Sequence, residues 1–468
     1  MSDIKNAAGD ICIIGAGIGG LTTGALLTRQ GYNVEIFEKE PIVGGRALSL
    51  NGNALTFETY NNVLSQFHMN IPFSEPNMET IFDKKMLAGY TLDLGFHTIG
   101  GGVGSNLERV LSEFGEPVEM LESKVGLIKN SDFDFPFLST GDKIKILPRI
   151  LQLLFSGEST MRKLDDIPMT ETINKYGKSK MKLILEIFSR AITTVNNLDR
   201  ISTGDAFRAQ KNLLNGSKPV GYPRHGLQRV SQTLAHIVKR YGGEIHLNHP
   251  VDKIIIDNNK IVGVVVGDEE HFFKTVITNI PVQNLFFIAD EKHFPTEYVR
   301  TLKTLTGTGS LCAYYSLNKI DPQLLGKSFL FIERNAGLAG NDAVGMIDFM
   351  AALPESGLAP TSHQLVQAYI ICSPDEAQSG KKLDELKNML DTNLENLMPA
   401  FRSHLQWSIY PAVWHLDGVA KTIDNKKPEI QTPIDNLYLV GDCVKSPDIG
   451  INCAINSAKT LQAILARE

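Results

Sequence analysis

Ile11-Cys12-Ile13-Ile14-Gly15-Ala16-Gly17-Ile18-Gly19-Gly20 is the stretch that decides the fold of this 468-residue chain. Its four leading apolar residues predict a buried parallel strand, and a glycine-rich turn follows at once in the pattern G-x-G-x-x-G. Residues 21–30 predict a helix, residues 34–37 a second strand, and Glu38 stands at the end of that strand. These parts, in this order and at this spacing, predict a dinucleotide site.

Each part has a chemical task in such a site. Gly15 permits a tight turn, Gly17 lets the backbone approach a pyrophosphate, and Gly20 packs the helix against the strand. The phosphates meet free N–H groups at the positive end of the helix, and Glu38 accepts hydrogen bonds from a ribose hydroxyl. Gly44-Gly45-Arg46 adds a second glycine pair, which an NAD site does not need, and a guanidinium that forks onto phosphate or carbonyl oxygens.

Two more blocks of the sequence also combine short apolar runs, glycines and a predicted helix. Near the other end of the chain, the apolar run 436–440 is closed by Gly441-Asp442, and Gly450-Ile451-Asn452 precedes a helix predicted over 453–465. The dipole of that helix would face a group that becomes anionic on reduction.

In the middle of the chain, residues 221–227 precede a helical stretch that ends near Gly243. Runs at 245–247, 251–257 and 261–266 predict strands, and Asn258-Asn259 predicts a hairpin turn between the last two.

From residue 11 to residue 465, the three blocks resemble the phytoene desaturase and carotenoid isomerase group of FAD enzymes within the amine oxidase superfamily. The resemblance implies FAD as the cofactor. It implies that Arg46 approaches the flavin and pyrophosphate, that Asp442 binds the ribityl–pyrophosphate region, and that Val251 meets the adenine through its backbone. The full set of candidate cofactor-binding residues is Gly15, Ala16, Gly17, Ile18, Gly19, Gly20, Glu38, Lys39, Gly44, Gly45, Arg46, Val251, Gly441, Asp442, Gly450, Ile451 and Asn452.

The predicted fold class is α/β: a Rossmann-like FAD-binding domain of the amine oxidase type with an inserted α+β substrate domain. The chain is too long for one small core. We expect the FAD-binding domain to comprise residues 1–104, 201–295 (with a β-meander) and 411–468. We expect the substrate domain to comprise a helical part, 105–200, and a second part, 296–410, with a largely antiparallel sheet and a helix at 382–397.

The composition and charge of the chain limit the kinds of binding partner that we expect. The formal net charge is −6 without basic blocks, so we expect no nucleic-acid partner. The five cysteines and the histidines show no metal-ligand spacing, so we expect no metal and reduced thiols in a cytoplasmic protein. No signal peptide and no membrane-spanning stretch is recognised. Residues 143–155 are apolar with basic residues at one end. They fit peripheral membrane contact, although a helix packed inward is the favoured alternative.

The candidates for catalysis are few, as expected where a cofactor performs the difficult step. Asp93-Leu94-Gly95 matches a family segment beside the flavin, so His97 is a candidate proton donor or polar anchor; a purely structural histidine is the alternative. Residues 407–415 hold both tryptophans and are a second candidate for the pocket wall, with core packing as the alternative. Residues 48–90 exceed the family pattern and are interpreted as a lid, an extra pocket wall or a surface loop.

These observations predict an FAD-dependent oxidoreductase that acts on carbon–carbon bonds of an apolar, polyene or isoprenoid-like substrate by desaturation, saturation or isomerisation. The chain has no second G-x-G-x-x-G motif for a nicotinamide domain, and its electron acceptor or donor is unknown. One alternative is a flavin amine or amino-acid oxidase. Another is a non-catalytic, prenyl-binding protein that resembles the Rab escort proteins, although those lack an intact phosphate motif.

Overall fold

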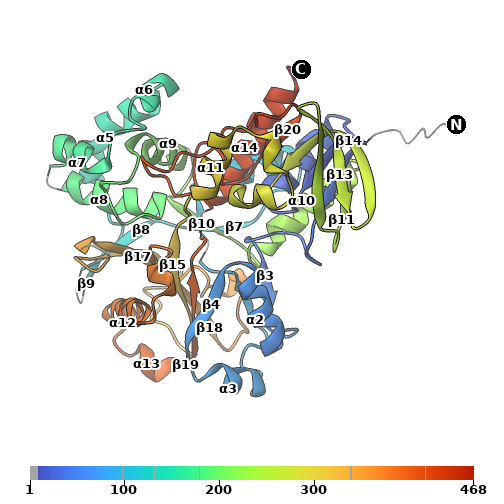
Figure 1. Cartoon of the computed structure of the whole chain (residues 1–468). Helices are drawn as coiled ribbons and strands as arrows, with labels where there is room; N and C mark the ends of the chain where they lie inside the picture. Colours follow the sequence, from blue (N-terminus) through green and yellow to red (C-terminus); the bar gives the residue numbers. More distant parts are fainter. Residues whose placement is uncertain are drawn as a thin grey trace, which may run out of the picture.

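A seven-stranded sheet carries both the first and the last motif of the chain (Figure 1). The computed structural model describes residues 9–96, 98–129, 132–178, 180–214, 216–337, 340–416 and 418–467. The sheet has the order β11-β2-β1-β14-β13-β12, and β20 also pairs with β14. Its strands are β1 (Gly9–Ile14), β2 (Val34–Phe37), β11 (Glu244–His246), β12 (Val251–Asp257), β13 (Lys260–Val266), β14 (Glu269–Thr278) and β20 (Leu437–Leu439).

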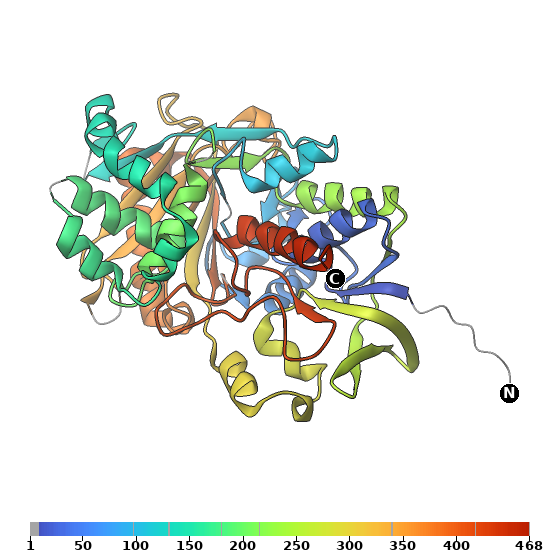
Figure 2. The ribbon, with the colours of Figure 1, turned by 90° about the horizontal axis from the view of Figure 1, so that it is seen from above.

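Three helices pack together at this sheet. They are α1 (Ile18–Arg29), α10 (Gln228–Arg240) and α14 (Gly450–Leu465), and α14 runs beside α1 (Figure 2). The predicted strands and helices of the three sequence blocks are confirmed within a few residues. Asn258 and Asn259 both have positive φ, 47° and 62°, as a two-residue hairpin turn between β12 and β13 requires.

Strand register brings the functional segments to one edge. β1 pairs in parallel with β2 on one side and with β14 on the other, so Ile14 lies opposite both Phe37 and Thr278. The residues that follow these three strand ends therefore emerge together at the carboxyl edge, where ligands bind in open α/β sheets.

A second, eight-stranded sheet forms the lower part of the molecule in Figure 1. Its order is β4-β19-β15-β18-β17-β16-β8-β9, and every neighbouring pair is antiparallel except β16 and β8. The largely antiparallel sheet predicted for this region is confirmed. Its strands are β4 (Met69–Glu75), β8 (Val125–Lys129), β9 (Asp132–Asp134), β15 (Gly309–Leu317), β16 (Ser328–Glu333), β17 (Ala343–Asp348), β18 (Gln364–Cys372) and β19 (Leu405–Val413), with α12 (Gly380–Leu397) and α13 (Phe401–His404) packed nearby.

Two sequence predictions need correction here. Residues 105–200 are not helical throughout, because they include β7 (Met120–Ser123), β8 and β9, and β8 pairs with β16. The extra segment 48–90 is not a plain surface loop. It contains β3 (Ser49–Asn51), α2 (Phe57–Gln66), β4 and α3 (Met78–Asp83), and β5 (Thr91–Asp93) follows it directly. β4 is an edge strand of the eight-stranded sheet.

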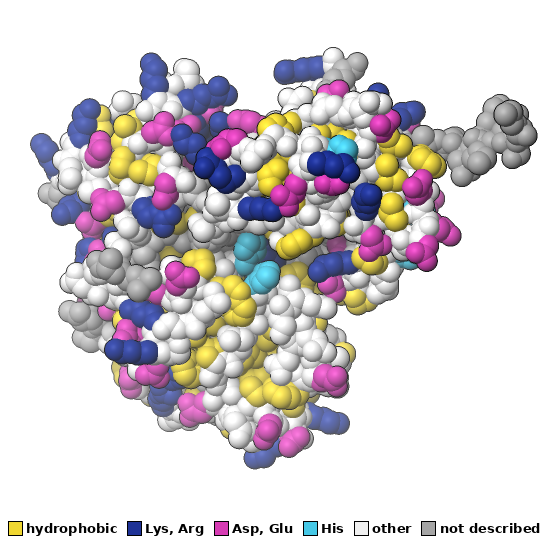
Figure 3. Space-filling model, viewed as in Figure 1, with side chains coloured by type: hydrophobic (Ala, Val, Ile, Leu, Met, Phe, Trp, Pro, Cys, Tyr) yellow, Lys and Arg dark blue, Asp and Glu magenta, His cyan; other side chains and the backbone are white. Residues whose placement is uncertain are grey.

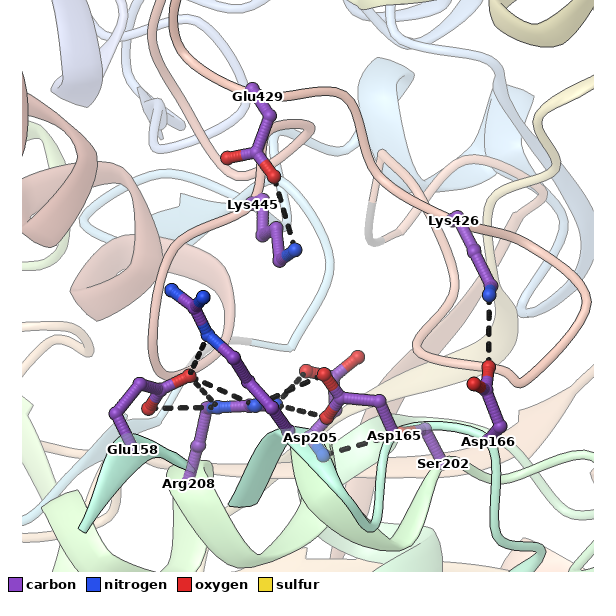
Figure 4. A network of polar contacts seen from close by, with 10 residues as sticks. Glu158, Asp165, Asp166, Ser202, Asp205, Arg208, Lys426, Glu429 and Lys445 are labelled. Carbon is purple, nitrogen blue, oxygen red and sulfur yellow. Dashed lines mark hydrogen bonds and ion pairs between the residues drawn. The ribbon is translucent and has the colours of Figure 1, made fainter. Parts of the chain in front are cut away.

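A helical cluster lies at the upper left of Figure 1 and meets the eight-stranded sheet where α8 contacts β17. Arg208 ties this cluster together, because its guanidinium pairs with Glu158 at 3.0 Å, Asp165 at 2.6 Å and Asp205 at 3.0 Å (Figure 4). The helices are α5 (Thr140–Phe155), α6 (Glu158–Arg162), α7 (Met169–Tyr176), α8 (Lys180–Thr193) and α9 (Thr203–Leu213). The remaining described α-helices are α4 (Asn106–Glu113) and α11 (Thr296–Thr304). The strands β6 (Ile99–Gly100) and β10 (Val220–Pro223) form a small sheet with β7.

Helix α5 presents four large apolar side chains to solvent. Ile144 and Phe155 are 67% and 85% exposed, Leu147 and Leu151 are also exposed, and α5 contains no buried residue. These four side chains follow one another along one face at helical spacing and do not pack inward. The apolar side chains of the other face, Ile146, Ile150, Leu153 and Leu154, are half-buried, and Ile146 packs against core residues, so the favoured prediction of inward packing holds for that face. Within the described ranges, no helix combines the length and the apolar character needed to cross a membrane.

Candidate active site

A cavity of about 630 Å³ gathers the predicted cofactor residues at the carboxyl edge of the seven-stranded sheet. All seventeen candidates line it except Ala16 and Gly20, which lie in the same glycine turn. The lining residues come from the first, middle and last sequence blocks, so the fold brings together segments that are more than 400 residues apart along the chain.

Two glycine turns lie against each other in the cavity wall. Gly15 has a φ of +98°, which favours glycine, and the N–H of Gly44 donates to the carbonyl of Ala16 at 2.9 Å. A Cβ on Gly20 would lie 2.1 Å from the carbonyl oxygen of Gly15, and one on Gly45 would lie 3.4 Å from the Cα of Gly17. The turns thus form a cradle that side chains would fill, and this geometry fits a pyrophosphate.

Glu38 lies beside the first turn. Its carboxylate accepts hydrogen bonds from the N–H of Ala16 at 2.6 Å and of Glu40 at 3.0 Å. Burial raises the pKa of Glu38, and the two backbone donors oppose that shift. These donors orient the carboxylate at the end of β2, where a ribose hydroxyl is expected.

Arg46 and Asp442 join the first motif to the last. Arg46 Nη2 lies 2.6 Å from Asp442 Oδ1, and Arg46 Nη1 donates to the carbonyl of Leu416 at 2.8 Å. The second carboxylate oxygen of Asp442 accepts from the N–H of Gly418 at 3.0 Å. The pair fixes the loop after β19 against the Gly-Asp turn after β20.

The N-terminal end of α14 completes this side of the cavity. Gly450, Ile451 and Asn452 line it, and the Asn452 amide donates to the carbonyl of Gly100 at 3.0 Å. Asn452 Oδ1 is buried and has no hydrogen-bond partner among the described residues. A buried acceptor of this kind at a cavity wall is typical of a site that a ligand completes.

Asn279 is a site residue that the sequence analysis missed. Asn279 follows β14. When its side-chain amide is oriented so that both its oxygen and its nitrogen have suitable hydrogen-bond partners, the oxygen accepts from the N–H of Gly17 at 3.3 Å and of Gly20 at 3.1 Å. A polar residue directly after a strand was the available signal. This signal identifies Asn279 as a site residue only when the pairing of β14 with β1 is known.

The predicted catalytic residue, His97, lies outside the described residues. Its neighbours Phe96 and Thr98 both line the cavity, and the Phe96 ring stacks on Tyr369 with 4.6 Å between centroids. Asp93, earlier in the same segment, is buried and accepts hydrogen bonds from the hydroxyls of Ser49 and Tyr222. The role of His97 as a proton donor or polar anchor therefore remains a proposal.

The other two candidate segments supply part of the wall. Trp407 is buried in the core beside Tyr90, so it does not line the cavity, whereas His415 does. From the extra segment, Gln66, Phe67 and His68 line the cavity, in agreement with the pocket-wall interpretation.

Comparisons with known proteins agree with this architecture. The sequence model of the family described as flavin containing amine oxidoreductase matches residues 18–461. The 1-hydroxycarotenoid 3,4-desaturase of Flavobacterium sp. (strain P99-3) is 24% identical over 335 residues, which cover 69% of this chain and 66% of that protein. The phytoene desaturase of Fusarium fujikuroi is 25% identical over 343 residues, which cover 69% of this chain and 57% of that protein. The chain thus spans less than two thirds of the length of these curated relatives.

Among solved structures, an oxidoreductase from Methanosarcina mazei superimposes with a TM-score of 0.69 at 21% identity, and the match covers 97% of this chain and all of that one. This likeness bears on the fold alone. It confirms the predicted α/β class with a Rossmann-like FAD-binding part.

Proposed function

Because this chain belongs to the family of flavin-containing amine oxidoreductases, we propose that it is an FAD-dependent oxidoreductase acting on carbon–carbon bonds of an apolar, isoprenoid-like substrate. The reaction would be desaturation, saturation or isomerisation. The observation that carries this proposal is the apolar and aromatic wall that adjoins the Arg46–Asp442 pair, made of side chains such as Phe67, Phe96 and Tyr369. A wall of this kind suits a hydrocarbon chain.

The described residues fit FAD. Gly15, Gly17 and the start of α1 would hold the pyrophosphate, and Glu38 would hold the ribose next to the adenine. Val251 would meet the adenine, while Asp442 and the start of α14 would hold the ribityl and flavin end. When bound, FAD supplies hydride transfer or charge sharing with a conjugated chain. The protein supplies the fixed orientation and the exclusion of water.

Other chemistries find less support in the described residues. The only group of three described side chains that could hold a metal ion is Glu35, Glu244 and His246, at the edge formed by β2 and β11. None of the three lines the cavity. The amine or amino-acid oxidase remains the alternative activity, and the curated relatives named above favour the isoprenoid substrate.

We also propose that the FAD-binding domain is discontinuous, at the boundaries predicted from the sequence. β4 is the exception, because it lies within 1–104 yet pairs with the eight-stranded sheet. The electron acceptor or donor would be oxygen, a quinone, a protein partner or a transiently bound nicotinamide.

The experiment that tests the function has two readouts. Denatured protein should release FAD, and mass spectrometry of an organic extract of the native protein should find an isoprenoid. An extract that contains no isoprenoid, together with anaerobic flavin bleaching by simple amines, would favour the amine oxidase instead.

We propose that His97 donates a proton or anchors the substrate. His97→Ala should lower turnover per bound flavin by about 100-fold, which is the usual scale for a positioned acid–base group. FAD content should survive, because Glu38, Arg46 and Asp442 are unchanged. Turnover per bound flavin close to that of the unmodified protein would remove His97 from the mechanism.

We propose peripheral membrane contact through α5. Its exposed apolar face, formed by Ile144, Leu147, Leu151 and Phe155, adjoins the exposed basic side chains of Lys143, Lys145 and Arg149. An apolar face flanked by cations is typical of helices that lie in the interface of an anionic bilayer.

A further inference from the structure

Two histidines from distant parts of the chain meet in the cavity wall. His68 directly precedes β4, and His415 follows β19 by two residues. β4 and β19 are paired antiparallel, with Met69 opposite Val413, and the N–H of Trp414 donates to the carbonyl of His68 at 3.2 Å. The imidazole ring centroids are 5.4 Å apart, with their planes tilted by 58°. A strand pair therefore sets the spacing of the two rings.

This pair lies next to the motif that joins the two ends of the chain. Arg46 Nη1 donates to the carbonyls of Leu416, at 2.8 Å, and His415, at 3.4 Å. His415 thus stands where the Arg46–Asp442 pair fixes the backbone, while His68 is exposed toward the mouth of the cavity. Figure 3 shows histidine side chains in the hollow between the upper and lower parts of the molecule.

His415 is held in its neutral form. Burial lowers the pKa of His415 to about 4, and the positive charge of Arg46 is the second cause of this shift. A neutral imidazole offers one hydrogen-bond donor and one acceptor. His415 Nε2 is buried and has no hydrogen-bond partner in the described part of the chain, which costs free energy until a partner is supplied.

We infer that His68 and His415 form a hydrogen-bonding subsite for an oxygen-bearing end, a hydroxyl or a carbonyl, of an otherwise apolar substrate. The inference rests on the proposed function and narrows its substrate class to oxygenated isoprenoids. The apolar wall would hold the chain, and the two imidazoles, His68 toward the mouth and His415 beside the Arg46–Asp442 pair, would hold the polar end. A hydrocarbon of the same skeleton would leave His415 Nε2 buried without a partner, and buried polar groups left unpaired discriminate strongly.

The experiment compares two ligands with one skeleton. Phytol and the hydrocarbon phytene are titrated into the FAD-loaded protein, and binding is followed by the change in flavin absorbance and by the quenching of tryptophan fluorescence. We expect phytol to bind about tenfold more tightly than phytene, the discrimination expected from one or two neutral hydrogen bonds. His415→Leu and His68→Leu should each reduce this preference and leave phytene affinity within about twofold.

Two further variants serve as controls. His415→Gln keeps a donor and an acceptor and should retain part of the preference for phytol. His236→Leu alters an exposed histidine on α10 outside the cavity wall and should leave the preference unchanged. The FAD content and melting temperature of each variant report whether it folds.

Three other outcomes would contradict the proposed subsite or the proposed function. Equal affinity of the unmodified protein for phytol and phytene overturns the subsite and leaves the proposed function standing. Loss of FAD from the folded His415→Leu protein, with the phytol preference intact in the protein that remains loaded, places this ring at the cofactor and overturns the subsite. Binding of neither ligand, with bleaching by amines, overturns the proposed function as well.

Discussion

At the scale of single residues, Gly17 is the position where an added side chain has the clearest consequence. A Cβ at Gly17 would lie 2.8 Å from the side-chain amide of Asn279 and would stand in the cradle expected to hold the pyrophosphate. Gly17→Val should therefore give folded but colourless protein. Gly157→Ala is the matched control, because nothing lies within 4 Å of a Cβ there, and it should keep its flavin. Full flavin occupancy in Gly17→Val, measured by absorbance per protein, would place the phosphates elsewhere.

Asp348 makes stability depend on pH. It is fully buried at the end of β17, and burial raises its pKa to about 7, although Ser328 and the N–H of Met350 donate to it. A carboxyl with a raised pKa in the folded state stabilises the fold fully below its unfolded pKa, and this contribution is lost as pH rises through the folded pKa. Between about pH 5 and pH 8 the loss from Asp348 should be about 2 to 3 kcal/mol.

Urea unfolding of the unmodified protein and of Asp348→Asn at both pH values checks this. The asparagine variant stays neutral, so its free energy of unfolding should fall less over the same interval. Equal slopes in the two proteins would mean that Asp348 is ionised at both pH values in the folded state.

The site residues that could be predicted were those whose role follows from a local sequence motif. Gly15, Glu38 and Arg46 belong to motifs whose spacing implies their task. Asn279 and His68 carry no such signal, because their position at the cavity depends on which strands pair. The sequence indicated an extra segment but left open whether it is a lid, a pocket wall or a surface loop, and it did not identify β19 as its partner strand.

At the scale of elements, α5 gives the clearest expectation. Changing Ile144, Leu147, Leu151 and Phe155 together to serine removes the exposed apolar face and should weaken binding to anionic lipid vesicles by more than about tenfold. Folding should be unaffected, because α5 contains no buried residue. Phe272→Ser, at another exposed aromatic position, is the control. If the unmodified protein does not co-sediment with such vesicles, the membrane proposal is wrong.

Arg208 should hold the helical cluster together. Its side chain is 10% exposed and faces three carboxylates, so Arg208→Leu leaves like charges together and should lower the free energy of unfolding by about 1 to 3 kcal/mol. The control is Lys426→Ala. Lys426 pairs with Asp166, both are mostly exposed (Figure 4), and the loss should be under about 0.5 kcal/mol. Equal effects, measured by chemical denaturation, would contradict this account.

Elements with a strong local pattern were predictable, and those selected by distant partners were not. The alternation and turn chemistry of 251–266 specify a hairpin locally. β8 is a short apolar run without helical or strand period, and its state is decided by pairing with β16, about 200 residues away along the chain. β4 likewise becomes a strand because β19 lies beside it.

At the scale of the whole molecule, the chain closes on itself at the cavity. Arg46 and Asp442 are 396 positions apart and in contact, and the walls between them come from both sheets. One cavity can therefore present a cofactor cradle from the seven-stranded sheet and a substrate wall from the eight-stranded sheet. This arrangement is the physical basis for proposing redox chemistry on an apolar molecule.

Anaerobic mixing of the protein with isoprenoids and with amines distinguishes the two activities. FAD-loaded protein is mixed anaerobically with an isoprenoid pool, once with oxidised and once with chemically reduced flavin, and in parallel with simple amines. Flavin absorbance and the chromatographic profile of the isoprenoids are recorded together. Our account predicts that the isoprenoids change in at least one flavin state while amines leave the flavin unbleached. Unchanged isoprenoids in both states, with bleaching by amines, would contradict it.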